Sequence, residues 1–183
     1  MLNTSLTHPL RIDEVQPLSG WGCIGMSLCP GKRQSNALSG NWERDLDLDI
    51  GVIRAWGAAA VVTLMDMREH DELNVLDLPE KVWGAEMEWI HLPIVDQHAP
   101  DAVFLRRWKT FGNRIVSTLA NGDRIFIHCK GGLGRTGTIA ACLLIESGMK
   151  SAEAMAYVRR VRRGAIETPE QERFVLGYEP CFR

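Results

Sequence analysis

The chain has 183 residues, with 21 Lys and Arg against 23 Asp and Glu, which gives a formal net charge of -2 at pH 7. This length is typical of one domain with a sizeable core, and the charge gives no general attraction to nucleic acid or to acidic membranes. No apolar run reaches the length of a membrane span, and the start of the chain lacks the basic and apolar segments of a signal peptide. Five cysteines without disulfide-framework spacing favour a reducing cytoplasm.

Hydrophobic periodicity predicts that strands and helices alternate along the chain. Strands are expected at short apolar or alternating runs, over 21–28, 59–65, 88–94 and 124–127. Helices are expected where apolar residues recur at helical spacing, over 44–56, 79–84, 102–120, 138–145, 152–163 and from 169 to about 178. The alternation indicates an α/β fold, with a central, mostly parallel sheet flanked by helices on both faces.

Other segments lack such periodicity. We expect an irregular arm over 1–17 and loops over 34–42 and 95–101, with a loop and a short helix over 66–78. Three aspartates, Asp45, Asp47 and Asp49, are expected on the solvated face of the helix 44–56. No repeat or low-complexity segment divides the chain, so 1–183 is interpreted as a single domain.

The stretch from His128 to Gly137 joins the apolar run 124–127 to a buried helix through a glycine-rich loop. Such a loop at a helix N-terminus binds anions, because backbone N–H groups and the positive end of the dipole face the ligand. The backbone of this loop can approach a phosphate closely, through Lys130, Gly131, Gly132, Leu133 and Gly134. Cys129 opens the loop and is expected to be a thiolate there, and Arg135 can hold two oxygens of a tetrahedral dianion. Thr136 can place a hydroxyl near the sulfur.

The pattern excludes a nucleotide-binding P-loop, because G-x-x-x-x-G-K-[ST] is absent. A Cys followed after five residues by Arg, with His128 before it and Thr136 after it, resembles the signature of the protein tyrosine phosphatase superfamily. Rhodanese-like and arsenate-reductase proteins also have a cysteine loop ending in arginine, but they are not expected to combine it with Gly-Arg-Thr-Gly this late in the chain. The resemblance implies a metal-independent, cofactor-free cysteine phosphatase with this fold.

Within the superfamily, most of the chain from about Trp21 to Tyr178 resembles the kinase-associated (cyclin-dependent kinase inhibitor 3) dual-specificity phosphatases. The resemblance rests on the cysteine loop from Ile127 to Arg135 (the active loop), on Pro93-Ile94-Val95-Asp96, on Cys29-Pro30-Gly31-Lys32, and on 164–168 before Gln171. Lys130 and Thr136-Gly137 are also found in phosphoinositide phosphatases. The cyclin-kinase partner of the human group does not carry over from these residues.

The superfamily uses an aspartate from a separate upstream loop as general acid, because a leaving oxygen with a high pKa needs a proton. The loop 95–101 offers Asp96 and Asp101. Asp101 directly precedes a long helix and is explained as its N-cap, so Asp96 is assigned as the acid. Asp66, just after a strand, is a third candidate.

Two further residues have structural and functional interpretations. His128 lies next to the nucleophile on a strand, so its ring should point away from the sulfur, and the resemblance gives it a role in fixing the loop. Gln171 is either the third residue of a capping box that begins at Thr168 or, by resemblance, the glutamine that positions the hydrolytic water. Near the C-terminal end of the helix 152–163, four cations fit either a docking patch for an acidic partner or the helix dipole: Arg159, Arg160, Arg162 and Arg163.

We therefore expect a cytoplasmic, monomeric phosphatase that acts on phosphorylated proteins, on phosphotyrosine and also on phosphoserine or phosphothreonine. No membrane, nucleic acid or metal is expected to take part. A phosphoinositide phosphatase and a phosphate-binding module without activity are the alternatives.

Overall fold

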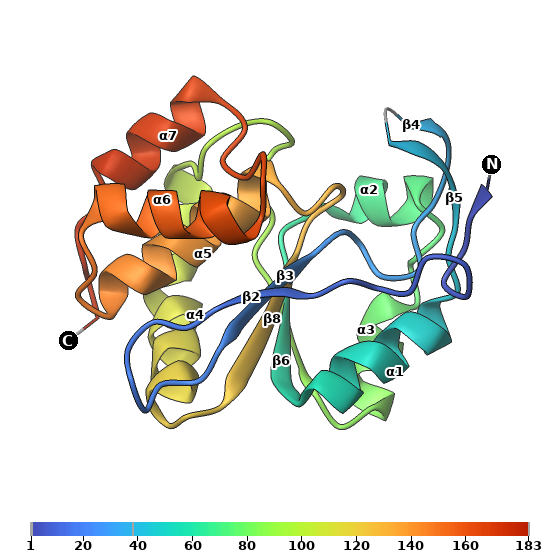
Figure 1. Cartoon of the computed structure of the whole chain (residues 1–183), viewed down its shortest axis with the longest axis horizontal. Coiled ribbons are helices and arrows are strands. Elements are labelled where there is room, and N and C mark those ends of the chain that lie inside the picture. The colour runs from blue at the N-terminus through green and yellow to red at the C-terminus, as the bar shows by residue number, and fades with distance from the viewer. Residues whose placement is uncertain (1, 38, 183) are drawn as a thin grey trace.

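The computed structural model describes residues 2–37 and 39–182. Its main sheet has the strand order β2-β3-β8-β6-β7 (Figure 1). The strands are β2 (Asp13–Val15), β3 (Ile24–Ser27), β6 (Ala58–Thr63), β7 (Glu88–His91) and β8 (Arg124–His128). Strands β3, β8, β6 and β7 are parallel, and β2 pairs antiparallel with β3 at one edge. The predicted α/β fold with a mostly parallel sheet is therefore confirmed.

Seven helices are described, and each corresponds to a predicted helical segment: α1 (Leu46–Trp56), α2 (Met67–Glu72), α3 (Leu78–Gly84), α4 (Ala102–Ala120), α5 (Gly134–Glu146), α6 (Ser151–Val161) and α7 (Pro169–Leu176). Figure 1 shows α1, α2 and α3 on one side of the sheet and α4 to α7 on the other. Every residue of α5 is buried, because this helix packs against the sheet as well as against α6 and α7. None of the described helices combines the length and apolarity that crossing a bilayer requires.

Two segments expected to be irregular contain strands. β1 (Leu2–Asn3) and β2 lie within the arm 1–17, and β4 (Arg33–Ala37) and β5 (Gly40–Glu43) lie within or overlap the predicted loop 34–42. β1, β5 and β4 form a separate small sheet. These strands are short and polar, so their pairing over long sequence distances leaves little hydrophobic alternation to detect. Leu38, in the same predicted loop, lies outside the described residues.

Asp49 is buried, contrary to the solvated position expected from its spacing. Its carboxylate accepts two hydrogen bonds from Arg44, at 2.7 Å from Nε and 2.8 Å from Nη2. It also accepts from the Gly31 amide at 2.9 Å and from the Ser5 hydroxyl at 2.8 Å. A buried carboxylate needs such partners to offset its lost hydration, so this pair joins the N-terminal arm to α1.

Helix α6 also differs from its predicted limits. It begins at Ser151 with Lys150 as the N-cap residue, and no side chain caps it, whereas Ser151 was expected to be the cap. It ends at Val161, two residues before the predicted end, because Arg162 has an extended backbone conformation. Arg162 and Arg163 are therefore part of the connection to α7 and not of a helical turn.

His128, at the end of β8, joins the central strands through side chains. Its Nε2 lies 2.8 Å from Thr63 Oγ1 on β6, and the same oxygen accepts a hydrogen bond from Trp89 Nε1 on β7 at 2.9 Å. The Thr63 proton is therefore available for donation to Nε2. Burial lowers the pKa of His128 to about 3, so the ring is neutral at physiological pH.

This burial predicts a specific loss of stability in acid. The pKa of His128 is lower in the folded protein than the value of about 6.5 in an unfolded chain, so the unfolded state alone takes up a proton as the pH falls from about 6.5 to about 3. The stabilisation from neutral His128 is complete above that window. Between pH 7 and pH 5 the wild type should lose about 2 kcal/mol of unfolding free energy relative to His128→Gln, measured by urea denaturation at each pH. A difference that stays constant over this range would contradict the prediction.

Candidate active site

The loop 129–133 connects the C-terminal end of β8 to the N-terminus of α5. Cys129 is 3% exposed, and the Gly132 amide donates a hydrogen bond to its sulfur at 3.2 Å. Gly132 has φ +72°, and a Cβ there would lie 2.1 Å from the carbonyl oxygen of Ser27 on β3. Glycine is therefore needed for the loop to close against the sheet beneath the nucleophile.

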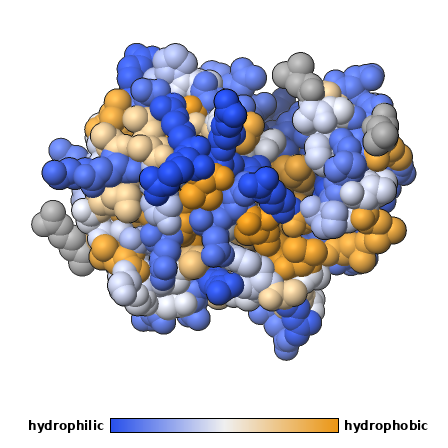
Figure 2. Space-filling view, in the orientation of Figure 1, coloured by the Kyte–Doolittle hydropathy of each residue, from blue (hydrophilic) through white to orange (hydrophobic). Residues whose placement is uncertain are grey.

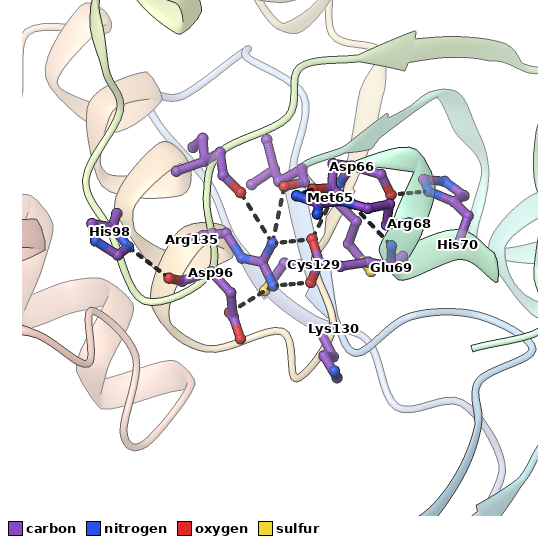
Figure 3. A network of polar contacts seen from close by, with 12 residues as sticks. Met65, Asp66, Arg68, Glu69, His70, Asp96, His98, Cys129, Lys130 and Arg135 are labelled. Atoms are coloured by element: carbon purple, nitrogen blue, oxygen red, sulfur yellow. Dashed lines mark hydrogen bonds and ion pairs between the residues drawn. The ribbon is translucent and has the colours of Figure 1, made fainter. Parts of the chain in front are cut away.

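Arg135, in the first turn of α5, is 1% exposed and is bound on several sides (Figure 3). Glu69 accepts from it bidentately, with Oε2 at 2.7 Å from Nη1 and Oε1 at 2.8 Å from Nη2. Nη1 also donates to the carbonyl oxygens of Leu64 at 3.3 Å and Ile94 at 3.1 Å. Asp96 Oδ1 lies 2.7 Å from Nη2, while the buried Nε has no partner in the described residues. An unpaired buried donor on a guanidinium is a binding position for an anion.

The three candidate acids occupy different places. Asp101 caps α4 by accepting from the Phe104 amide at 2.8 Å, which is the structural role expected for it. Asp66 caps α2 in a capping box with Glu69. Asp96 caps no helix in the described part of the chain, its side chain is 54% exposed, and it contacts Arg135. The structure brings Asp96 together with the loop and assigns the other two aspartates to helix ends.

Glu69 was not found by sequence reasoning. Its side chain is 12% exposed and pairs with Arg135. Its Oε2 also accepts from the Asp66 amide at 3.1 Å. The only local signal was the Asp66–Glu69 spacing of a capping box, which indicates a helix start and no contact with Arg135. Since the two partners are separated by 66 residues, their pairing depends on the fold.

Two other missed cations hold the loop from outside. Arg162 donates from Nε to the Gly132 carbonyl and from Nη2 to the Gly131 carbonyl at 3.3 Å, while Asp13 lies 2.7 Å from its Nη1. Lys32 is 4% exposed and donates from Nζ to the Lys130 carbonyl at 3.4 Å. Burial lowers the pKa of Lys32. Amide groups that face an anion leave their carbonyls facing away, and these side chains satisfy three of the carbonyls.

The supporting residues are placed as follows. Gln171 is fully buried, and its Oε1 accepts from the Glu167 amide at 3.0 Å, while its Nε2 donates to the His98 carbonyl at 3.1 Å. The capping box expected for Thr168 and Gln171 is present. Thr136 Oγ1 is buried without a partner among the described residues. Gly134 donates its amide to Glu167 Oε2 at 2.8 Å, so this amide already has an acceptor.

Lys130 turns its side chain to Glu72, with Nζ 3.5 Å from Oε2.

Within residues 2–37 and 39–182, no group of three or more His, Cys, Asp or Glu is placed to hold a metal ion. Sulfur, loop amides, a buried guanidinium and a separate carboxyl group thus meet at one end of the sheet. This combination can bind a tetrahedral oxyanion, attack its central atom and transfer a proton.

Comparison with known proteins gives the same family. A family model described as the DSP-PTPase phosphatase domain of a Swiss Army Knife protein matches residues 43–175. Human protein tyrosine phosphatase type IVA 3 is 43% identical over 128 residues, covering 70% of this chain and 68% of that protein. Rat cyclin-dependent kinase inhibitor 3 is 29% identical over 176 residues, covering 91% and 77%. Zebrafish dual specificity protein phosphatase CDC14AB is 32% identical over 111 residues, which span only 17% of that protein.

Solved structures agree on the fold. Kinase associated phosphatase, with its catalytic site cysteine substituted by serine, superimposes with a TM-score of 0.79 at 23% identity, over 91% of this chain and 92% of that one. Tk-PTP in the active form gives a TM-score of 0.62 at 29% identity, over 84% and 88%. With the family match covering residues 43–175, the chain belongs to the cysteine-based protein tyrosine phosphatase superfamily, as a phosphatase domain of the dual-specificity type.

Proposed function

We propose that this protein hydrolyses phosphate monoesters on proteins through a phosphocysteine intermediate at Cys129. The proposal rests on the way the nitrogens of the Arg135 guanidinium differ in their contacts. Glu69 and two carbonyls fix Nη1, whereas Nε has no partner among residues 2–37 and 39–182, and Nη2 also contacts Asp96. A phosphate dianion fits the edge formed by Nε and Nη2, where two parallel N–H donors match two of its oxygens.

In the first step, the Cys129 thiolate forms a bond to phosphorus while the bond from phosphorus to the leaving oxygen breaks. The leaving oxygen takes the proton of the Asp96 carboxyl group. A phosphate bound at Nη2 replaces Asp96 as the partner of this nitrogen, so substrate binding itself frees the acid. Arg135 and the loop amides stabilise the charge on the remaining oxygens.

In the second step, water attacks the phosphocysteine and transfers a proton to the Asp96 carboxylate. The phosphorus–sulfur bond breaks, and inorganic phosphate and the thiolate are released. Gln171 anchors the loop 95–101, which carries Asp96 (the acid loop). Both atoms of its side-chain amide are bound, because Oε1 accepts from the Glu167 amide and Nε2 donates to the His98 carbonyl. In this proposal it positions the loop rather than the water.

Phosphoproteins are the substrate class that we assign. A phosphoinositide head group carries several phosphates and needs cations next to the nucleophile for the phosphates that do not react. Here Lys130 of the loop pairs with Glu72, and Arg135 at the start of α5 pairs with Glu69, so neither cation is available for a second phosphate. The relatives named as tyrosine and dual specificity protein phosphatases support the same class. We also infer a monomer in the cytoplasm, where the reducing environment keeps Cys129 from oxidation.

The first prediction concerns the nucleophile. Turnover of p-nitrophenyl phosphate should continue in excess EDTA and should fall to background in Cys129→Ser, because a serine hydroxyl at its ordinary pKa is a poor nucleophile here. Cys142→Ser, which removes a buried thiol from the middle of α5, is the matched control and should keep the activity. Activity in Cys129→Ser, or strict dependence on a divalent ion, would contradict the thiolate mechanism.

The second prediction separates the two aspartates of the acid loop. Asp96→Ala should lower kcat by roughly 10²–10⁴-fold on a substrate with a high-pKa leaving group, and by much less on an activated one. Asp101→Ala should instead lower the unfolding free energy by about 1 kcal/mol, with little kinetic change, because it removes a helix cap. Steady-state kinetics and urea denaturation of both variants test this, and reversed phenotypes would overturn the assignment.

The third prediction concerns Glu69. Glu69→Gln keeps the shape of the side chain but removes the charge from the bidentate pair with Arg135. We expect kcat/KM to fall about 10- to 100-fold, because a misplaced guanidinium loses binding to the transition state. Asp71→Asn, at an exposed position on the same helix, is the control for neutralising one acid on α2. Equal effects in the two variants would show that the helix charge, and not the pairing, matters.

A further inference from the structure

Beside the active loop lies a strongly basic pocket. Its volume is about 400 Å³, and its lining comprises Arg11, Asp13, Leu133, Arg160, Val161, Arg162 and Arg163. Leu133 belongs to the active loop itself, so the pocket adjoins the place where phosphate binds. Figure 2 shows strongly hydrophilic side chains gathered over the C-terminal end of α6, where three of these arginines lie.

The charges of this pocket are not balanced within it. Asp13 is its single carboxylate, and it is shared by Arg11 and Arg162, each with a nitrogen 2.7 Å from one of its oxygens. Arg160 and Arg163 are both exposed, and neither forms an ion pair with a residue in 2–37 or 39–182. The Arg160 guanidinium lies 4.8 Å from the centre of the Tyr157 ring, which holds it while leaving its N–H groups free for an acceptor. The lining thus has an excess of three positive charges in a chain of net charge -2.

The helix dipole does not explain this cluster. Cations are favoured in the last turn of a helix, which accounts for Arg159 and Arg160. Arg163 lies beyond the end of α6, and Arg11 comes from the segment before β2. Arg162 has a separate task, since it donates to the carbonyls of the active loop. Side chains from two distant segments therefore converge on one pocket without a common local cause.

We propose that this pocket binds acidic residues that flank the phosphorylated residue of the protein substrate. The inference rests on the proposed phosphoprotein activity and extends it to sequence preference. Guanidinium groups match carboxylates with two parallel hydrogen bonds, and Arg160 and Arg163 supply two such groups at an exposed rim. Charges at a rim mainly accelerate association and reject partners of like charge, so the preference should depend on ionic strength.

A protein segment fits this pocket better than a membrane surface does. Membrane-docking surfaces combine cations with exposed apolar side chains that enter the interface. The apolar residues of this lining are Leu133 and Val161, and both are only partly exposed. A concave pocket of about 400 Å³ suits side chains of an extended peptide, whose residues follow each other at about 3.3–3.6 Å.

The test uses two phosphotyrosine peptides that differ only in the residues flanking phosphotyrosine, with three glutamates on each side in one and three glutamines in the other. The wild type should show a kcat/KM ratio of about 10 in favour of the acidic peptide at low salt, and this ratio should fall with added salt. In Arg160→Glu/Arg163→Glu the ratio should fall to about 1 or below. Arg54→Glu reverses an exposed charge on α1, on the other side of the sheet, and should leave the ratio at its wild-type value.

The outcomes distinguish this inference from the proposed function. Wild-type turnover of p-nitrophenyl phosphate and of both peptides supports the phosphatase activity on its own. If the two peptides are then turned over equally, the pocket proposal is wrong while the activity stands. An equal loss on both peptides in the double variant, with a lowered melting temperature, would mean that these arginines act on folding and would also overturn the proposal. The double variant is also assayed on a soluble phosphoinositide. A loss of turnover confined to that substrate would overturn the proposal and assign the pocket to a lipid head group instead.

Discussion

The site depends on the burial of one guanidinium. Arg135 extends from the start of α5 and is bound by Glu69 of α2, by the Leu64 carbonyl after β6, and by the Ile94 carbonyl and Asp96 after β7. Arg135 is 1% exposed, and burying its charge costs several kcal/mol of hydration free energy, which these partners must offset. Two segments that follow the ends of neighbouring strands, one after β6 and one after β7, are therefore fixed relative to Cys129 by a single side chain.

In the proposed mechanism, the same guanidinium links substrate binding to acid catalysis. Nη1 contacts only the scaffold, whereas Nη2 is shared between Glu69 and Asp96, and Nε has no partner in the described residues. In the proposed mechanism, phosphate and Asp96 compete for Nη2. A bound phosphoester then displaces Asp96 from Arg135, so the carboxyl group becomes available only when a substrate is present.

Local signals in the sequence were enough for much of this architecture. The glycine-rich loop between an apolar strand and a buried helix predicted the place of Cys129 and Arg135, and the limits Ala102–Ala120 of α4 agree with the periodicity and with the cap at Asp101. Contacts between distant segments were missed. Glu69 lies within an ordinary capping box, and Asp49 lies at a position with solvent-facing spacing. Arg162 belongs to a run of arginines that, from the sequence alone, also fitted a helix end. The partners of Glu69 and Arg162 are far away in the sequence. Asp49 pairs with the nearby Arg44, but in a buried network that hydropathy does not indicate.

The acid loop shows how the fold limits the motion of Asp96. Its first end is held at Ile94 by Arg135, and its second end by the Gln171 bond to the His98 carbonyl, by Glu170, and by the cap at Asp101. Between these anchors, His98 Nδ1 lies 2.8 Å from the Asp96 carbonyl, so the backbone at Asp96 is also bound. The carboxyl group itself contacts Arg135, and 54% of the Asp96 side chain is exposed. In the proposed mechanism, Asp96 therefore leaves Arg135 by rotation about its side-chain bonds, while the bond from Gln171 to the His98 carbonyl keeps the loop in place.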